Sequence, residues 1–149
     1  FNADELSLIL NDIQPYEFQL FVRFAYYTGT RQGEIRCLND DNIKHAYVSG
    51  KSGKRQIKIT MQAQAVLGEV EELWNYSKNY ICSKFKENME ILEIPGARFH
   101  DLRRTFGYNL IKQGIPIYQV SKLLGHASVT TTEKHYAPLL ATDVEEFVL

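Results

Sequence analysis

Residues 98–106 read Arg-Phe-His-Asp-Leu-Arg-Arg-Thr-Phe, in the last third of a chain of 149 residues. The apolar residues Phe99, Leu102 and Phe106 recur at helical spacing, which predicts a helix with one face against a core. His100 and Arg103 stand three residues apart and therefore share the side of this helix at the edge of the apolar stripe. A cation beside an imidazole at the border of a core fits an anion site, but a solvated basic helix face gives the same pattern.

The overall composition predicts one ordinary globular domain. Hydrophobic residues make up 44% of the chain and charged residues 23%, and the length allows a sizeable core. No apolar run approaches the roughly 18 residues that a membrane helix needs, and the first residues do not read as a signal peptide. Cys37 and Cys82 lack the spacing of a zinc or disulfide framework, so we expect them to be small buried apolar side chains. These features favour a cytoplasmic location.

The charges are segregated along the chain. The formal net charge is −1, which by itself argues against binding to nucleic acid. Residues 44–58, however, carry five Lys or Arg and no acidic residue, and residues 98–136 carry six Lys or Arg against two acidic residues. This distribution predicts a locally positive face on a nearly neutral protein, which a polyanion would meet.

Apolar periodicity and end signals predict that most of the chain is helical. Asn2 can cap the first helix, Gly29 ends the second, and Gly114 follows a central helix at residues 98–112. Thr130 and Glu133 stand in capping-box relation for a short helix that Pro138 closes. The expected helices span residues 2–13, 15–28, 30–38, 62–76, 80–92, 98–112, 116–124, 130–137 and 143–149.

Residues 39–60 change to a strand-like pattern. Short β-branched runs at 43–48 and 55–60 are separated by Ser-Gly-Lys-Ser-Gly-Lys at 49–54, which predicts a hairpin, with or without a third short strand. The turn is not a P-loop, because the glycine spacing differs and a strand follows where a helix should begin. An edge hairpin whose lysines discourage aggregation is the alternative. The expected fold class is therefore mainly α with a small antiparallel β-sheet (α+β).

A second candidate site lies at the end of the second expected helix. Residues 28–34 read Thr-Gly-Thr-Arg-Gln-Gly-Glu, so Arg31 and Glu34 stand three residues apart. The Glu34 carboxylate can hold the Arg31 guanidinium in place. An ordinary surface ion pair of little energetic value is the alternative.

Five segments together resemble the catalytic domain of the tyrosine recombinases, the phage integrase family. The resemblance covers residues 28–139 and implies the architecture of the DNA breaking-rejoining enzymes. Each segment alone is weak, but the five occur in the order of the family with suitable gaps. They are T-G-T-R-Q-G-E at 28–34, G-K-S-G-K-R at 50–55, H-D-L-R-R-T-F at 100–106, L-G-H-A-S at 124–128 and T-T-E-K-H-Y-A at 131–137.

The resemblance implies a role for each matching position. Arg31 and Arg103 match the two arginines that grip the scissile phosphate. His100 and His126 match the two histidine positions, and Tyr136 matches the nucleophile. The usual gap between the second histidine and the tyrosine is nine residues, whereas here it is ten. No other tyrosine lies nearby, so Tyr136 remains the expected nucleophile.

Further positions carry supporting roles in the same resemblance. Lys51 matches the hairpin lysine that protonates the leaving oxygen, with Lys54 as the competing candidate. Glu34 falls where the family carries an acid that supports the first arginine. Lys54, Arg55 and Arg104 are expected to contact DNA. No metal or other cofactor is expected, because the arginines occupy the role of a cation.

The chemistry of phosphoryl transfer explains these residue types. A tyrosine with a pKa near 10 is ionised only about one part in a thousand at pH 7, a handicap of about 4 kcal/mol. Nearby arginines favour the phenolate, and a histidine can take its proton. Two permanently charged guanidiniums can bind the non-bridging phosphate oxygens. The covalent phosphotyrosine keeps the bond energy, so a 5′-hydroxyl can reverse the step on a new strand without ATP.

The expected function is that of a site-specific DNA recombinase or integrase from a bacterium, phage or other mobile element. Its partners would be double-stranded DNA and further copies of itself, as a dimer or tetramer on DNA. Alternatives are a type IB topoisomerase and an accessory DNA-binding protein with a decayed site. Residues 1–149 are expected to form one catalytic domain of a longer protein whose smaller N-terminal domain precedes it. A metal site at the histidines is disfavoured, because ligand spacing is lacking and Arg103 would repel a cation.

Overall fold

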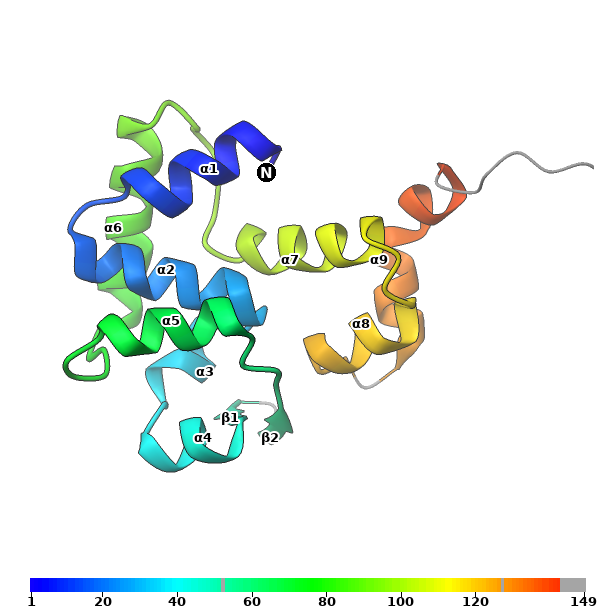
Figure 1. Ribbon diagram of the computed structural model, residues 1–149. Helices are drawn as coiled ribbons and strands as arrows, with labels where there is room; N and C mark the ends of the chain where they lie inside the picture. The colour runs from blue at the N-terminus through cyan, green and yellow to red at the C-terminus, as the bar shows by residue number, and fades with distance from the viewer. Residues whose placement is uncertain (52, 127, 143–149) are drawn as a thin grey trace, which may run out of the picture.

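The computed structural model describes residues 1–51, 53–126 and 128–142, with side chains through residue 136. Within them the chain is mainly helical with one two-stranded antiparallel sheet, as the sequence predicts (Figure 1). The elements are α1 (Ala3–Asp12), α2 (Tyr16–Thr28), α3 (Gln32–Arg36), α4 (Asp40–His45), β1 (Tyr47–Gly50), β2 (Gly53–Gln56), α5 (Met61–Glu69), α6 (Lys78–Ile91), α7 (Asp101–Lys112), α8 (Ile117–Leu124) and α9 (Val129–Thr142).

Local signals in the sequence fix several helix ends. Asn2 and Glu5 form a capping box, in which each side chain accepts a hydrogen bond from the backbone N–H of the other residue at 2.8–2.9 Å. Gly29 ends α2 with φ +68°, and its N–H donates to the Ala25 carbonyl. Gly125 ends α8 in the same left-handed conformation. These helix ends are confirmed.

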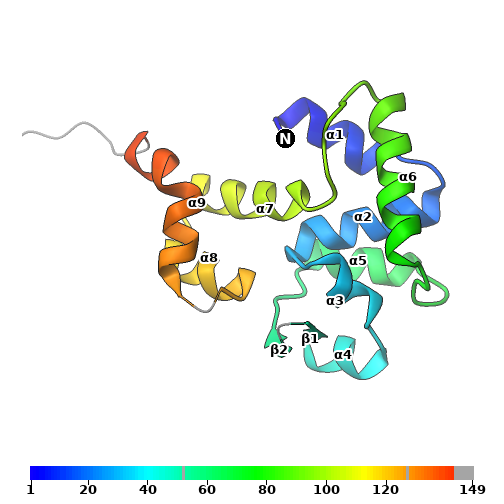
Figure 2. The same cartoon turned by 180° about the vertical axis from the view of Figure 1, so that it is seen from behind.

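The larger hydrophobic cluster is built around α2. Phe18, Phe21 and Phe24 are fully buried, and α2 packs against α1, α5 and α7. The Phe21 ring lies 5.5 Å from the rings of both Trp74 and Phe99, at separations favourable for aromatic pairs. Figures 1 and 2 show α1, α2, α5 and α6 gathered on one side of the molecule.

A smaller cluster holds α8 and α9 on the end of α7. Its buried members are Ile111, Val120, Leu124 and Tyr136. The helix α7 contributes Leu102 to the larger cluster and Ile111 to the smaller one. It therefore joins the main body to what we call the α8–α9 lobe, residues 117–142 (Figure 2).

The hairpin exists but is shorter than its sequence pattern predicts. The register pairs Tyr47 with Gln56 and Gly50 with Gly53, so Lys51 lies in the turn. Residues 43–45, expected to begin the first strand, belong to α4 instead. Asn39 and Asn42 make a second capping box there, and this polar start outweighs the β-branched Ile43. No third strand is present among the described residues.

Two expected helix ends are wrong. The helix expected at 62–76 ends at Glu69, and an irregular segment follows in which the Trp74 indole donates to the Glu17 carbonyl at 3.2 Å. The helix expected to close at Pro138 continues to Thr142. Proline removes one hydrogen bond from a helix, and packing of α9 on α7 and α8 compensates for that loss. The helix expected at 143–149 lies outside the described residues.

The two cysteines are not buried. Cys37 and Cys82 are both exposed free thiols, so the expectation that they pack as small apolar side chains is wrong. Cys37 follows the short helix α3, and Cys82 occurs on the outer face of α6, whose buried residues are Ile81, Phe85, Asn88 and Met89. None of the helices described is long and apolar enough to cross a membrane.

Asn88 generates a test of how the helical body is held together. Its side chain is 4% exposed and accepts from the Gln14 N–H at 2.9 Å while donating to the Gln14 carbonyl at 2.8 Å. Asn88→Ala removes both hydrogen bonds, each worth about 0.5–1.5 kcal/mol, so we expect the free energy of unfolding to fall by about 1–3 kcal/mol. Urea unfolding measures the change. Asn79→Ala, on the exposed start of the same helix, is the matched control and should shift stability by less than about 0.5 kcal/mol.

Candidate active site

Arg31 lies at the start of α3 and lines a cavity of about 300 Å³ with Glu34, Lys51 and His100. Glu34 closes the first turn, since its carboxylate accepts from the Arg31 backbone N–H at 2.8 Å. The Arg31 Nη1 atom is 3.8 Å from Glu34 Oε2, beyond hydrogen-bonding distance. Arg31 Nη1 is buried and has no hydrogen-bond partner among the described residues. The site therefore holds a cationic group with unused donor capacity.

The Glu34 carboxylate is committed to Arg55 instead. Arg55 Nε donates to Oε2 at 2.7 Å and Nη2 donates to Oε1 at 2.9 Å. Glu34 is 4% exposed. Burial by itself raises the pKa of Glu34, but hydrogen bonds from Arg55 and from the Arg31 backbone outweigh it and hold the pKa below its usual value. The carboxylate is therefore ionised at neutral pH.

Arg103 is buried between the ends of two helices. Its guanidinium donates to the Gly29 carbonyl at 2.7 Å and to the Leu124 carbonyl, and the residue is 5% exposed. Burial, with the neighbouring charges of Arg31 and Arg55, lowers the pKa of Arg103 to about 9. The group remains a cation at neutral pH, and it fixes the end of α2 relative to the end of α8.

His100 precedes α7 and reaches the same cavity as Arg31. Burial and the charges of Arg103, Arg104 and Arg31 lower the pKa of His100. The imidazole is therefore mainly neutral at neutral pH. A neutral imidazole can accept a proton, as a general base must.

His126 follows Gly125 at the end of α8. Its Nδ1 lies 2.5 Å from the hydroxyl oxygen of Thr132, which is fully buried in α9. Burial, followed by the charges of Arg103 and Arg31, lowers the pKa of His126 to about 4. The contact of Thr132 with His126 was not expected, because Thr132 is one of three consecutive threonines in the sequence. Its position one helical turn before Tyr136 is the signal that could have indicated that its side chain faces inward.

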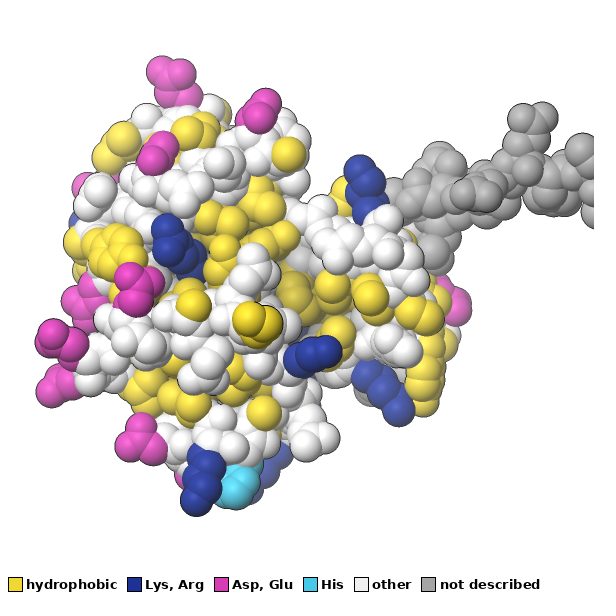
Figure 3. Space-filling model, in the orientation of Figure 1, with side chains coloured by type: hydrophobic (Ala, Val, Ile, Leu, Met, Phe, Trp, Pro, Cys, Tyr) yellow, Lys and Arg dark blue, Asp and Glu magenta, His cyan; other side chains and the backbone are white. Residues whose placement is uncertain are grey.

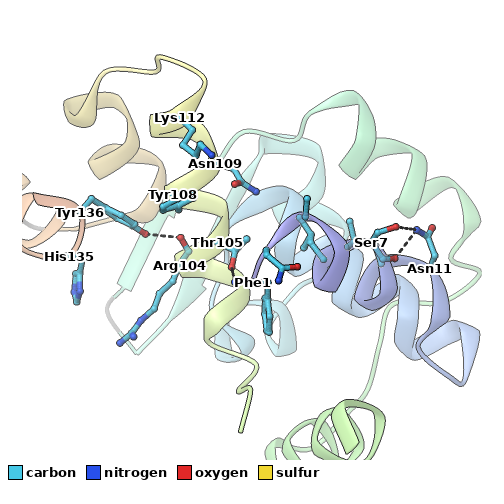
Figure 4. A pocket seen from close by; sticks show the side chains of 14 residues that line it. Phe1, Ser7, Asn11, Arg104, Thr105, Tyr108, Asn109, Lys112, His135 and Tyr136 are labelled. Carbon is cyan, nitrogen blue, oxygen red and sulfur yellow. Dashed lines mark hydrogen bonds between the residues drawn. The ribbon is translucent and has the colours of Figure 1, made fainter. Parts of the chain in front are cut away.

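Tyr136 lies in a different cavity from Arg31. Its hydroxyl donates to the Arg104 carbonyl at 3.1 Å and packs directly against Gly107 of α7 (Figure 4). Tyr136 and His135 line a cavity of about 910 Å³ bounded by α1 and α7. Burial raises the pKa of Tyr136, partly offset by the charges of Arg103 and Arg104. The phenol is 8% exposed and protonated at neutral pH.

The basic residues expected to contact DNA occupy three different environments. Lys54 is exposed, with its ammonium 5.1 Å from the centre of the Tyr47 ring. Arg104 is also exposed and lines the cavity beside Tyr136. Arg55 is 12% exposed and paired with Glu34, so its guanidinium is used inside the protein.

Charged side chains divide between parts of the surface. In the view of Figure 3, most visible Asp and Glu side chains lie around the body formed by α1, α2 and α5, whereas Lys and Arg side chains lie mainly on the α8–α9 lobe and beside the hairpin, with further dark blue within the body. In the portion of the chain that the structure describes, no three His, Cys, Asp or Glu side chains are grouped to hold a metal ion.

Sequence comparisons relate the chain to recombinases and integrases. Residues 76–142 match the family described as the Phage integrase family. A tyrosine recombinase XerC-like protein of Caldanaerobacter subterraneus subsp. tengcongensis is 30% identical over 74 residues, which cover 50% of this chain and 18% of that protein. The integrase of Escherichia phage 186 is 24% identical over 145 residues, covering 91% of this chain and 43% of that protein. The chain thus matches less than half the length of either relative.

Solved structures share the fold. The crystal structure of XerA recombinase superposes with a TM-score of 0.77 at 17% identity, covering 99% of this chain and 64% of that one. XerH recombinase bound to its difH substrate gives 0.72 at 17% identity over 99% and 54%. The Tn1549 transposon integrase bound to transposon right end DNA gives 0.73 at 15% identity over 91% and 60%. The expected catalytic-domain architecture is confirmed.

The contact between Tyr136 and Gly107 predicts an unusual response to a glycine substitution. In an exposed helix interior, Gly→Ala raises stability by about 0.5–1 kcal/mol, and we expect this for Gly68→Ala, whose Cβ would meet open space. Gly107→Ala should lower stability instead, because its Cβ would overlap the Tyr136 hydroxyl. Thermal unfolding of both variants provides the comparison.

The same contact can be tested from the other side. Tyr136→Phe removes the overlapping oxygen, so the penalty for Gly107→Ala should be smaller in that background. An equal penalty in both backgrounds would show that the hydroxyl adds nothing to the overlap with the ring carbon Cζ, which would lie 2.8 Å from the added Cβ.

His126 predicts a pH dependence of stability. The unfolded state binds a proton to this residue near pH 6.5, whereas the folded state binds it only near pH 4. Between these values the unfolded state holds more protons, so the free energy of unfolding should fall as the pH drops from 6.5 to 4. Urea unfolding across this range measures the slope, to which His100 also contributes. His126→Gln should flatten it, and an unchanged slope would contradict the low pKa.

Proposed function

The chain belongs to the phage integrase family of tyrosine recombinases, and we propose from this premise that it carries the active site of a site-specific DNA recombinase. The enzyme would cut and rejoin DNA strands through a covalent 3′-phosphotyrosine intermediate. The observation that carries the proposal is that Arg31 lines a cavity with Lys51 and His100 while its buried Nη1 has no partner in the described part of the chain. A DNA phosphate would supply the missing acceptor.

The scissile phosphate is proposed to bind at Arg31, and the buried positive charge of Arg103 is proposed to stabilise it as well. Charge on the non-bridging oxygens rises during phosphoryl transfer, and fixed guanidiniums stabilise it without reorganising. Arg103 already donates to two helix-end carbonyls, so its position is set before DNA arrives. In this proposal the two cations fill the role of a metal ion, and the reaction needs neither a metal nor ATP.

The proton transfers follow from the neighbouring side chains. The Tyr136 oxygen attacks phosphorus and forms the P–O bond, while its proton passes to a histidine. The 5′ oxygen leaves and takes a proton from a lysine. Low pKa values keep His100 and His126 neutral, which lets them accept a proton. A bound phosphate adds an opposite charge and raises both pKa values, which strengthens them as bases.

Lys51 is the better candidate for the general acid. It lies in the hairpin turn and lines the cavity with Arg31 and His100. Lys54 does not line that cavity, and its ammonium faces the Tyr47 ring. We propose that Lys51 protonates the leaving oxygen and that Lys54 and Arg104 contact the DNA backbone.

The proposed reaction requires Tyr136 to leave its contact with α7. In the structure its hydroxyl points to the Arg104 carbonyl, and Tyr136 does not line the cavity that contains Arg31. We infer that the phenol turns towards this cavity when DNA is bound. The energy of the phosphodiester is kept in the phosphotyrosine bond, so a 5′-hydroxyl of another strand can complete the exchange.

The proposed partners are double-stranded DNA and further copies of the chain. Two of the structural relatives are complexes with DNA, XerH with difH and the Tn1549 integrase with transposon right end DNA. Because the chain covers only part of its relatives, we expect weak, salt-sensitive binding by residues 1–149 alone, carried mainly by phosphate contacts.

A nicked DNA duplex tests the proposed chemistry. Mixed with a duplex that carries the candidate recombination site and a nick beside it, the protein should form an SDS-resistant adduct, because the short fragment diffuses away and traps the intermediate. Tyr136→Phe should abolish the adduct, since it lacks the attacking oxygen. Electrophoresis of the denatured mixture measures the yield.

Tyr118→Phe is the matched control. Tyr118 is 59% exposed on α8, and its replacement should leave the adduct unchanged. An adduct that survives in Tyr136→Phe would refute Tyr136 as the nucleophile. Relaxation of supercoiled plasmid without recombinant products would favour the topoisomerase alternative.

A further inference from the structure

We propose that Arg55 is a positioning residue, which occupies the Glu34 carboxylate and thereby leaves the Arg31 guanidinium free for the scissile phosphate. The inference rests on the proposed function and assigns to Arg55 a task inside the protein instead of on the DNA surface. It follows from three features: the contacts of Glu34, the alternative partner open to Glu34, and the space that the fold reserves for Arg55.

The Glu34 carboxylate has both oxygens engaged. Arg55 contacts them with two separate nitrogens, at 2.7 and 2.9 Å, in the two-point geometry that makes arginine–carboxylate pairs strong. Oε1 also accepts from the Arg31 backbone N–H. The Arg31 side chain is thus left 3.8 Å away, close to the carboxylate but not bonded to it.

Without Arg55, Glu34 would turn to Arg31. A carboxylate that is 4% exposed cannot remain ionised without a cation, because an uncompensated buried charge is strongly unfavourable. The Arg31 guanidinium is the nearest remaining partner, three residues away on the same helix turn. Direct pairing would commit Arg31 Nη1, the donor that now has no partner among the described residues, and a phosphate that binds it would then have to displace Glu34.

The fold makes room for Arg55 with glycines. A Cβ at Gly125 would overlap the Arg55 Cδ atom, and a Cβ at Gly50 would come within 3.1 Å of Glu34 Cγ. Both glycines therefore allow the ion pair to lie against the backbone. At Gly125 the left-handed φ of +72° also favours glycine.

Arg55 also connects this ion pair to the end of α8. Its Nη1 donates to the Leu123 carbonyl at 2.5 Å, and Arg103 donates to the next carbonyl, that of Leu124. Cations at a helix C-terminus interact favourably with its dipole. The two arginines together hold the segment that leads into His126. The Arg55 guanidinium by itself joins the hairpin to α3 and to α8.

The test is a cycle of substitutions read through the rate of adduct formation on the nicked duplex. Arg55→Gln should lower the single-turnover rate about tenfold to a hundredfold, as misplacement of a catalytic group commonly does. Adding Glu34→Gln should restore much of that rate, because an uncharged glutamine at position 34 no longer competes for Arg31. Rates are compared at a temperature where circular dichroism shows every variant to be folded, because neutralising Glu34 also relieves the uncompensated buried charge. Under this condition a purely structural role for Arg55 predicts no loss of rate in Arg55→Gln.

Arg23→Gln is the matched control. Arg23 also donates to a carbonyl in the last turn of a helix, that of Leu10 at 2.6 Å, but it belongs to α2 and connects that helix to α1. Its replacement should lower thermal stability without changing the rate of adduct formation at a temperature where the protein is folded. If Arg55→Gln does not fold, Arg55→Lys replaces it, with a smaller loss and the same recovery expected.

Binding of inorganic phosphate separates this inference from the proposed function. In NMR spectra, phosphate should shift the Arg31 Nε–Hε signal of the unmodified chain. The same shift should need a higher phosphate concentration in Arg55→Gln, and the original concentration should suffice again in the double variant. This pattern without any adduct would support the role of Arg55 and count against the recombinase proposal. A Tyr136-dependent adduct whose loss in Arg55→Gln is not restored by Glu34→Gln would overturn the role of Arg55 alone.

Discussion

The arrangement of the whole site depends on keeping three guanidinium groups, two of them largely buried, close to a single buried carboxylate. Arg103 is buried against the carbonyls of Gly29 and Leu124, Arg55 is bound by Glu34 and the Leu123 carbonyl, and Arg31 is only partly compensated within the described residues. Three like charges repel one another, and acceptors at helix ends hold two of them, Arg55 and Arg103. These acceptors lie at the ends of α2 and α8, so the cations act together with the hydrophobic cluster on α7 in attaching the α8–α9 lobe to the helical body.

Much of the fold could be predicted because its end signals are local. Asn2 with Glu5, Gly29 and Gly125 act through contacts within a few residues, so the sequence suffices to locate them. The expected strand start and the expected helix end were wrong where competing signals in the sequence had similar strength. Ile43 suggested a strand, but the paired caps Asn39 and Asn42 made α4 helical. Beyond Glu69 helical periodicity continues, yet Trp74 is anchored to Glu17, which is 57 residues distant.

The part of the candidate site that belongs to sequence motifs could be predicted. The motifs selected Arg31, Lys51 and His100, and these line one cavity. The pairing of Arg55 with Glu34 joins positions 21 residues apart and depends on the hairpin register, which the sequence did not specify. The withdrawal of Tyr136 onto Gly107 depends on how α9 packs on α7. Its only sequence signal is a glycine in the middle of an otherwise regular helix.

The central claim is that the Tyr136 oxygen forms the bond to DNA, and peptide mapping of the covalent adduct tests it most directly. After nuclease and trypsin digestion, mass spectrometry should find the nucleotide on the peptide that begins at His135, in which Tyr136 is the one tyrosine up to residue 149. A nucleotide on a peptide containing Tyr108 or Tyr118, or on a side chain other than tyrosine, would contradict the account.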